Sequence, residues 1–193
     1  FLRQAGYAGG EPVLDPMCGS GTFVIEAAEM AVGLMPGRSR SFAFEYLASF
    51  DPAAWDAMRG ATKSATTDMR FHGSDRDAGA IRMSGANADR AGVTALCDFQ
   101  CLPVADLTRP DGPPGLVIVN PPYGGRIGNM KLLYAVPRTL GQVLKDRFSG
   151  WRVGIVTSES KLAYATGLPF VPPGPPVAHG GLKVKLYPTK ALP

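Results

Sequence analysis

Short apolar runs alternate with helical stretches along most of the chain, and this alternation restricts the fold more than any other feature of the sequence. Such alternation is typical of a parallel sheet whose strands are joined by helical crossovers, so we expect an α/β domain. The expected strands lie at residues 12–14, 69–73, 94–101, 116–119, 152–157 and 182–187. The expected helices lie at residues 21–32, 77–91 and 131–147, with a further helix that opens at Asp51 and runs through Met58.

Two segments interrupt this rhythm. Residues 34–68 form an insertion in the first crossover, and their first half is rich in glycine, proline, arginine and aromatic residues. Residues 168–180 are too rich in proline for regular structure, so a loop is expected there. Because neither segment separates two cores, we expect residues 1–193 to form a single domain. The first residue is Phe1 instead of methionine, and we take the domain to be a piece of a longer protein.

The composition narrows the class of protein. With 45% hydrophobic and 19% charged residues, a folded globular chain is expected. No apolar run is long enough to cross a bilayer and no signal-peptide pattern is present, so we expect no membrane partner and a cytoplasmic location. The three cysteines form no C-x-x-C pair, and no metal site is expected. The net charge of +4 is compatible with a polyanionic partner but indicates nucleic acid only weakly.

The stretch VLDPMCGSGTFVIEAA, residues 13–28, joins a strand, an acidic residue, a glycine-rich turn and an amphipathic helix. Gly19 and Gly21 let the backbone come close to a ligand, and a helix N-terminus attracts negative charge. Asp15 would repel a pyrophosphate, and Val24 stands where a dinucleotide fingerprint has its third glycine. A ligand with an ammonium group and a carboxylate but no phosphate, such as S-adenosylmethionine, fits better. The alternative is a tight strand-to-helix turn with no ligand.

Two acidic residues follow the second expected strand. Asp75 stands at the end of that strand, where its carboxylate can accept the hydroxyl hydrogens of a ribose. Asp77 opens the next helix, and we expect it to be an N-terminal helix cap rather than a ligand contact.

The stretch NPPYGGRIG, residues 120–128, directly follows another expected strand. Two prolines there offer no N–H and restrict the backbone, and an exocyclic amine is a poor nucleophile because its lone pair is delocalised. The Asn120 side chain and the Pro121 backbone supply carbonyl acceptors for the amine hydrogens, Pro122 stiffens the corner, and Tyr123 can stack on a planar target. The corner therefore predicts methyl transfer to an amine held in line with a sulfonium methyl group. A plain proline turn is the alternative.

Three stretches together resemble the methyltransferase module of the THUMP-linked RNA guanine-N2-methyltransferases: DPMCGSGT at 15–22, GSD at 73–75 and NPPYG at 120–124. The aromatic insertion FAFEYLASFDPAAWDAM at 42–58 also resembles one of that family. The resemblance covers nearly the whole chain. It implies a Rossmann-like class I S-adenosylmethionine-dependent methyltransferase, with a doubly wound sheet of mostly parallel strands, seven in that fold, and an antiparallel last strand. It also implies methyl transfer to the N2 amine of guanine in ribosomal RNA.

The resemblance, with the reasoning from the residues, gives an expected site. The catalytic corner is expected to consist of Asn120, Pro121, Pro122 and Tyr123. The residues expected to hold the cofactor are Asp15, Met17, Cys18, Gly19, Ser20, Gly21, Thr22, Asp75, Arg76, Leu102 and Asn120.

The chain departs from that family in two respects. Family members carry an acidic residue after the third strand that holds the adenine amine, and Pro103 stands at the matching position here. We therefore expect the backbone near Leu102 to contact the adenine. The THUMP domain, which the family uses to hold RNA, is not part of these residues, so RNA capture is expected to need it.

Other functions stay open. The corner at residues 120–123 is shared with adenine-N6 nucleic-acid methyltransferases and glutamine-N5 protein methyltransferases, so either target is an alternative. A non-catalytic module that binds S-adenosylmethionine is a further alternative, although it predicts damage to this corner and the corner is intact. A nicotinamide-dependent oxidoreductase is disfavoured by Asp15 and Val24.

Overall fold

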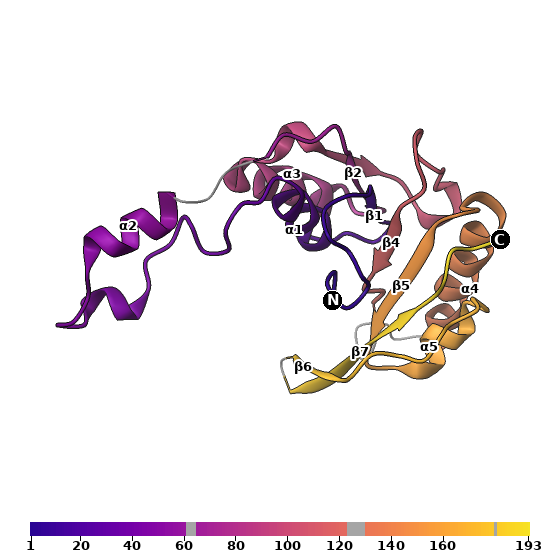
Figure 1. The fold of residues 1–193 in the computed structure, drawn as a ribbon. Coiled ribbons are helices and arrows are strands. Elements are labelled where there is room, and N and C mark those ends of the chain that lie inside the picture. Colours follow the sequence, from indigo (N-terminus) through magenta and orange to yellow (C-terminus); the bar gives the residue numbers. More distant parts are fainter. Residues whose placement is uncertain (61–64, 123–129, 180) are drawn as a thin grey trace.

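The computed structural model describes residues 1–60, 65–122, 130–179 and 181–193. In these residues the strands form one seven-stranded sheet in the order β3-β2-β1-β4-β5-β7-β6 (Figure 1). The parallel strands are β1 (Val13–Asp15), β2 (Phe71–Asp75), β3 (Cys97–Cys101), β4 (Leu116–Val119) and β5 (Arg152–Thr157). β7 (Leu182–Pro188) runs antiparallel to β5, and β6 (Val177–His179) runs antiparallel to β7. The expected mostly parallel sheet with an antiparallel last strand is therefore confirmed.

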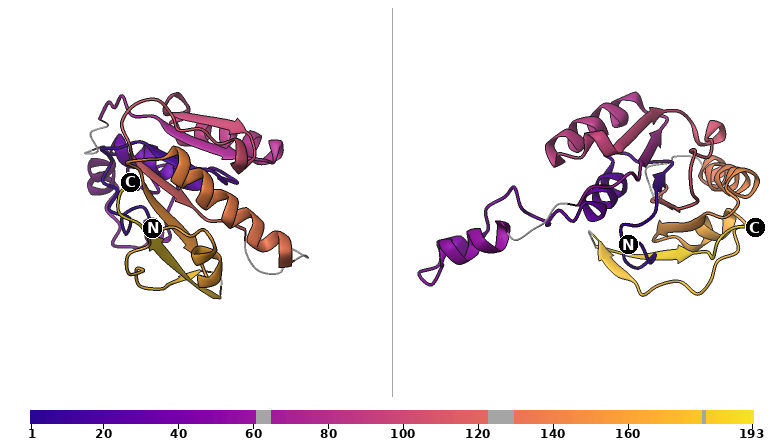
Figure 2. Two further views of the ribbon diagram at one scale, coloured as in Figure 1. Left: turned by 90° about the vertical axis from the view of Figure 1, so that its right-hand side faces the viewer. Right: turned by 45° about the horizontal axis from the view of Figure 1, so that its top comes forward.

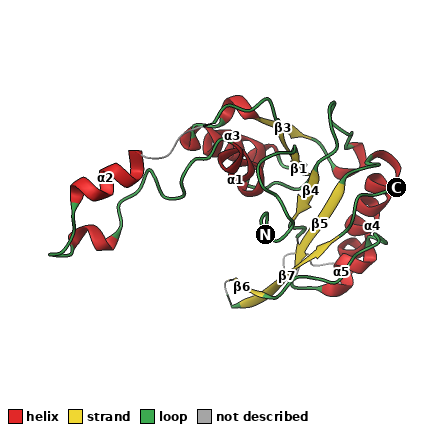
Figure 3. Ribbon diagram, in the orientation of Figure 1, coloured by secondary structure: helices red, strands yellow, loops and turns green. Residues whose placement is uncertain are grey.

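Helices cover both faces of the sheet, which forms the central layer (Figures 2 and 3). The helices are α1 (Thr22–Ala31), α2 (Pro52–Gly60), α3 (Ala78–Ala91), α4 (Met130–Arg147) and α5 (Ser160–Ala165), with short 3-10 turns η1 (Ala43–Tyr46), η2 (Thr94–Leu96) and η3 (Val104–Asp106). Leu116 and Ile118 of β4 point into the core beneath α1, whereas Val117 and Val119 point into the core beneath α4 and α5. β4 is thus buried on both faces, as its unbroken apolar sequence predicts.

In the part of the chain that the structure describes, no helix combines the length and the apolar character that a bilayer crossing requires.

The order of the strands reverses beside β1. From β1 the chain winds outward to β2 and β3, and it then returns to place β4 on the other side of β1. Open α/β sheets bind their ligands outside the carboxyl ends of the strands at such a reversal. Here the carboxyl ends of β1, β2 and β4 lead to Asp15, Asp75 and Asn120.

The insertion projects away from the body of the molecule, with α2 at its far end (Figure 1). Trp55 of α2 packs edge-on against Phe42 and Phe44, with ring centroids 5.8 and 5.0 Å apart, and the Arg59 guanidinium stacks on Trp55 at 4.7 Å. Asp51 caps α2 as expected, since its Oδ1 accepts a 3.1 Å hydrogen bond from the N–H of residue 54. The insertion therefore has a small cluster of partly exposed aromatic side chains of its own.

Two expected strands differ from the structure by two residues or more at one or both ends, and the other expected strands differ by at most one residue. The strand expected at 94–101 begins only at Cys97, because its partner β2 begins at Phe71, the residue that pairs with Cys97. Residues before Cys97 have no partner strand and form η2 instead. The strand expected at 69–73 ends two residues later, at Asp75, which is therefore itself a strand residue.

The expectation of a loop throughout 168–180 is wrong at its end. The prolines of this segment all precede Val177, so the next residues are free to pair, and they form β6 against the start of β7. The six-residue helix α5 was not expected either, because one and a half turns are too short to show a helical period.

Candidate functional site

Asp15 ends β1, and its side chain is buried at the carboxyl edge of the sheet. Its Oδ1 accepts a 3.0 Å hydrogen bond from the backbone N–H of Met17. Burial raises the pKa of Asp15 to about 7; the Met17 N–H lowers this pKa, and the nearby Asp75 carboxylate raises it. A buried carboxylate is stabilised in its charged form by a neighbouring cation, so Asp15 is suited to receive a positively charged group.

The turn after β1 depends on two glycines with positive φ, +53° at Gly19 and +82° at Gly21. A Cβ on Gly21 would lie 3.1 Å from the Cβ of Ser84 and 3.2 Å from the ring of Phe99. At Gly19, by contrast, no atom of the described residues lies within 4 Å of the position that a Cβ would take. Gly21 therefore allows close packing of the turn on α3 and β3, whereas Gly19 leaves the outer side of the turn open to a ligand.

Asp75 connects the end of β2 to this turn. Its two carboxylate oxygens accept hydrogen bonds from the backbone N–H groups of Gly19, at 3.1 Å, and Asp77, at 3.0 Å. A carboxylate offers about four lone-pair sites, so both oxygens can accept further hydrogen bonds. The Asp77 side chain instead accepts from the N–H groups of Gly79, at 2.6 Å, and Ala80, at 3.4 Å. The expectation that Asp77 caps the helix is confirmed.

Two polar residues of α3 hold the same turn and were not expected from the sequence. The Ser84 hydroxyl donates to the carbonyl of Gly19 at 2.8 Å, and the Asn87 amide donates to the carbonyl of Ser20 at 2.7 Å. One signal could have identified Ser84: it lies four residues before the buried Ala88, on the core-facing side of a helix where an apolar residue is the rule.

Cys18 lies beneath the turn. Its N–H donates to the carbonyl of Ser74 at 2.9 Å, and its Sγ lies 3.7 Å from the Ser84 hydroxyl. Burial raises the pKa of the Cys18 thiol to about 12, and the Asp15 carboxylate acts in the same direction. Because the thiolate is the nucleophilic form, Cys18 contributes packing and not reactivity.

The segments that follow β1, β2 and β3 contain the other residues expected at the cofactor site: Met17, Ser20, Thr22, Arg76 and Leu102. Leu102 is held beside β2, because its N–H donates to the carbonyl of Asp75 at 3.0 Å. Pro103 follows and directly precedes η3. The backbone of Leu102 therefore lies next to the residue that is expected to bind the ribose.

The corner after β4 begins at Asn120, which is exposed, and continues with Pro121, which is buried, and Pro122, which is exposed. β4 lies directly beside β1, so Asn120 stands at the same edge of the sheet as Asp15. Tyr123, the remaining residue of the expected catalytic corner, lies outside the described residues.

These groups suit a zwitterionic ligand with hydroxyl groups. The Asp15 carboxylate is buried and has its pKa raised, the turn is open at Gly19, and the half-buried Asp75 retains acceptor capacity. An ammonium group would offset the burial of Asp15, and ribose hydroxyls could donate to Asp75. The residues present thus fit S-adenosylmethionine.

The comparison with protein families agrees with this fit. The family described as "RMKL-like, methyltransferase domain" matches residues 1–168. The ribosomal RNA large subunit methyltransferase K/L of Chromohalobacter salexigens is 44% identical over 168 residues, which cover 82% of this chain and 23% of that protein. The chain therefore spans less than a quarter of the length of this curated relative.

Solved structures with the same fold include SMU.472, a candidate methyltransferase complexed with SAH. It matches with a TM-score of 0.90 and 26% identity, over 100% of this chain and 51% of its own. A protein from Listeria monocytogenes described as a predicted N6-adenine-specific DNA methylase matches with a TM-score of 0.78 and 29% identity, over 94% of this chain and 47% of its own. The fold is that of the class I S-adenosylmethionine-dependent methyltransferases, as the sequence predicts.

Proposed function

The chain belongs to the family of RMKL-like methyltransferase domains, and from this premise we propose that it transfers a methyl group from S-adenosylmethionine to the N2 amine of a guanine in ribosomal RNA. The observation that carries the proposal is the cluster of Asp15, Gly19 and Asp75 around one turn, on the strand next to the one that leads to Asn120. The 44% identity to a ribosomal RNA large subunit methyltransferase supports the substrate class.

The cofactor is proposed to lie against the turn at residues 17–22. When bound, S-adenosylmethionine supplies a methyl group on a positively charged sulfur. Asp15 accepts a hydrogen bond from the ammonium group and is held in its charged form by it. Asp75 accepts the ribose hydroxyl hydrogens, and the open side of Gly19 admits the ligand to the backbone. The crystal structure of SMU.472, which was solved in complex with SAH, supports this choice of cofactor.

The corner after β4 is proposed to activate the target amine. The Asn120 side-chain carbonyl and the Pro121 backbone carbonyl accept its two hydrogens, which turns the nitrogen lone pair out of the plane of the base and toward the methyl carbon. Pro122 restricts the backbone of the corner, and Tyr123 stacks on the flipped base. Transfer would form the bond from the nitrogen to the methyl carbon while the bond from that carbon to sulfur breaks and its electron pair stays on the sulfur of the departing SAH. The nitrogen would release one proton to solvent, which reaches the exposed Asn120.

A second candidate target is the N6 amine of adenine. It is favoured by the 29% identity to the Listeria protein, which is described as a predicted N6-adenine-specific DNA methylase. The same pair of carbonyl acceptors can hold either exocyclic amine, so the target depends on what surrounds the base.

RNA capture is proposed to need a part of the protein beyond residues 1–193. The chain spans 23% of the matched relative and has a net charge of only +4, which gives a modest and salt-sensitive attraction to phosphates.

A ribosomal RNA substrate also implies that the protein works in the cytoplasm.

Analysis of the methylated nucleoside tests the proposal. The 193-residue chain, and separately a longer protein that contains it, is incubated with methyl-labelled S-adenosylmethionine and unmodified ribosomal RNA, and the RNA is digested to nucleosides. Label in N2-methylguanosine is expected, with more product from the longer protein and far less from its Asn120→Ala variant. Label in N6-methyladenosine would select the second candidate. Label in another nucleoside would contradict both candidate targets, and label in no nucleoside, although SAH binds, would contradict transfer to nucleic acid.

A further inference from the structure

Each backbone carbonyl of the turn at residues 18–20 accepts a hydrogen bond from the protein. The first is bound within the turn by the N–H of Gly21 at 2.8 Å. The second is bound by the Ser84 hydroxyl at 2.8 Å, and the third by the Asn87 amide at 2.7 Å. Two of the three donors are thus side chains of α3, 65 and 67 residues further along the chain.

Ser84 is fixed in place by its surroundings. It is fully buried, and its hydroxyl also lies 3.0 Å from the carbonyl of Ala80 in the preceding turn of the helix. The Cys18 thiol lies 3.7 Å from the same oxygen and can donate to it. The hydroxyl has only one proton, and the shorter distance makes the Gly19 carbonyl its better acceptor, so the buried side chain holds the turn against α3.

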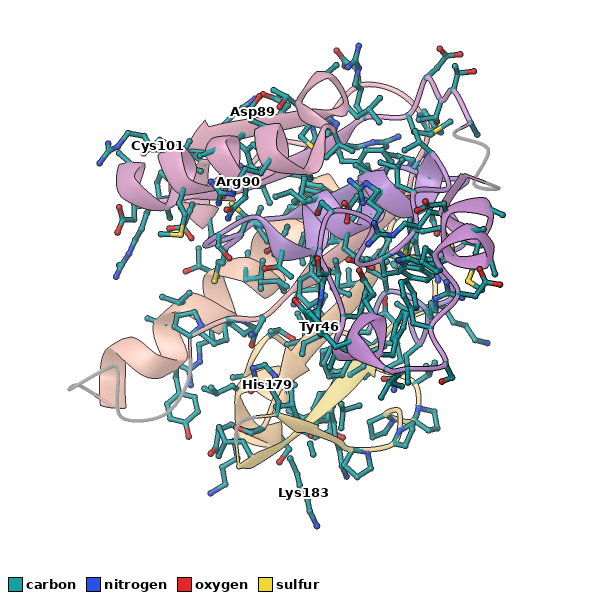
Figure 4. The ribbon with its side chains drawn as sticks, turned by 90° about the vertical axis from the view of Figure 1, so that its left-hand side faces the viewer. Tyr46, Asp89, Arg90, Cys101, His179 and Lys183 are labelled. Atoms are coloured by element: carbon teal, nitrogen blue, oxygen red, sulfur yellow. The ribbon has the colours of Figure 1, made fainter. Side chains whose placement is uncertain are left out.

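Asn87 is fixed from the surface side. Arg90, which lies on the outer side of α3 (Figure 4), donates to the Asn87 Oδ1. With its oxygen engaged there, the amide presents its Nδ2 to the carbonyl of Ser20. α3 therefore supplies both a buried and a half-buried support to one turn.

We propose that Ser84 and Asn87 are positioning residues of the cofactor site. In a trans peptide the N–H points away from the preceding carbonyl, so a Gly19 carbonyl drawn toward α3 aims the N–H of Ser20 to the opposite side. The position that a Cβ of Gly19 would take is open, so the carboxylate of the cofactor has room to approach this turn and accept from the N–H. Asn87 holds the next peptide group, whose N–H, from Gly21, closes the turn.

The inference deepens the proposed function, because it names the residues that shape the cofactor-binding turn, and it can be tested without ligand. Ser84→Ala is compared with Ser74→Ala, since Ser74 is also buried but its hydroxyl has no hydrogen-bond partner among the described residues. Amide hydrogen exchange at Gly19 and Gly21, whose N–H groups are hydrogen-bonded in the ligand-free chain, is expected to speed up about tenfold in Ser84→Ala and to stay unchanged in Ser74→Ala.

Titration with SAH gives the second readout. The Kd is expected to rise about tenfold in Ser84→Ala and to stay within about twofold of the wild-type value in Ser74→Ala. In the longer, active protein the KM for S-adenosylmethionine should rise while kcat is kept, which separates positioning from chemistry.

Asn87→Ala is a second test in case Ser84→Ala does not fold, because Asn87 is only half-buried and alanine favours a helix. It should also raise the Kd, whereas its control Asp89→Ala, at an exposed position of the same helix, should not. Equal exchange and equal affinity in the variants and their controls would overturn the inference. If the wild-type chain does not bind SAH, the proposed function fails, and the exchange comparison still decides whether α3 holds the turn.

Discussion

At the scale of single residues, the burial of Asp15 links the stability of the domain to pH. The pKa of this carboxyl is raised from its ordinary value of 3.8 to about 7 in the folded chain, mainly by burial. A raised pKa means that the fold binds the proton more tightly than the unfolded chain does. The contribution of this protonation to the free energy of unfolding is therefore fully present below about pH 3.8, and it is lost as the pH rises through about 7.

Asp15→Asn should separate stability from binding. The variant keeps the shape of the side chain without its charge, so the ligand-free domain should be more stable than wild type by a few kcal/mol above pH 7. Its loss of stability between about pH 4 and pH 7 should be correspondingly smaller. SAH binding should nevertheless be lost, and in the wild type it should tighten as the pH rises through about 7. Thermal unfolding across pH measures the stability, and titration with SAH across pH measures the binding. The exposed Asp56→Asn serves as the control. Stability and binding that depend on pH in the same way in wild type and Asp15→Asn would contradict the account.

Asn120→Ala should impair chemistry and not cofactor binding. Asn120 is exposed and lies after the end of β4, so its loss should not disturb the core. Removing one acceptor from the target amine should lower the single-turnover rate on RNA by about 10²-fold or more, by analogy with the loss of one oriented hydrogen-bonding group in other enzymes. The SAH Kd, measured in parallel, should change little. A variant with the full rate would remove the corner from the mechanism.

At the scale of elements, glycine decides how closely helices can approach. A Cβ on Gly141 of α4 would lie 1.8 Å from the backbone carbonyl oxygen of Thr166, at the end of α5. A Cβ on Gly85 of α3 would meet nothing within 4 Å among the described residues. The two glycines occupy the same kind of helix position and differ only in what faces them.

The same substitution should therefore have opposite effects at these two sites. Gly141→Ala should lower the free energy of unfolding by about 1–3 kcal/mol or more, because two helices must separate. Gly85→Ala should raise it by about 0.5–1 kcal/mol, because alanine favours the helix and restricts the unfolded chain. Urea unfolding of both variants measures this, and destabilisation of equal size in both would show that the packing of α4 on α5 is not as described.

Elements with a strong local pattern were predictable from the sequence, and elements defined by a distant partner were not. The unbroken apolar run of β4 and the Asp77 cap of α3 follow from neighbouring residues alone. The start of β3 depends on where β2 begins, and β6 depends on pairing with β7. In the site, the acidic and glycine residues were identified by their motif, whereas Ser84 acts on a turn 65 residues away and leaves only a weak local signal.

At the scale of the whole molecule, the cofactor site and the projecting insertion are separate. Tyr46, Leu47 and Met58 of the insertion are among the most exposed large apolar side chains of the described residues, and Figure 4 shows Tyr46 at this surface. The insertion meets the body near its base, where Arg38 pairs with Glu29 at 2.7 Å. The site residues described above all belong to the body.

Replacing residues 40–62 with a short glycine-serine linker should therefore spare the cofactor site. The SAH Kd should stay within about twofold of the wild-type value, since the shortened loop keeps Arg38 and only modestly changes the entropy of closing the connection. Titration calorimetry on both proteins provides the comparison. Lost binding in a shortened chain that still unfolds cooperatively would mean that the insertion supports the site.

The central claim is that the turn between β1 and α1 holds S-adenosylmethionine, and titration calorimetry with two ligands tests it most directly. SAH and NAD are each titrated into the 193-residue chain, and the SAH titration is repeated with Asp75→Ala. We predict saturable binding of SAH, no binding of NAD, and a loss in Asp75→Ala of about 1.5–3 kcal/mol for each charge-assisted hydrogen bond removed. Binding of NAD without any response to SAH would contradict the account.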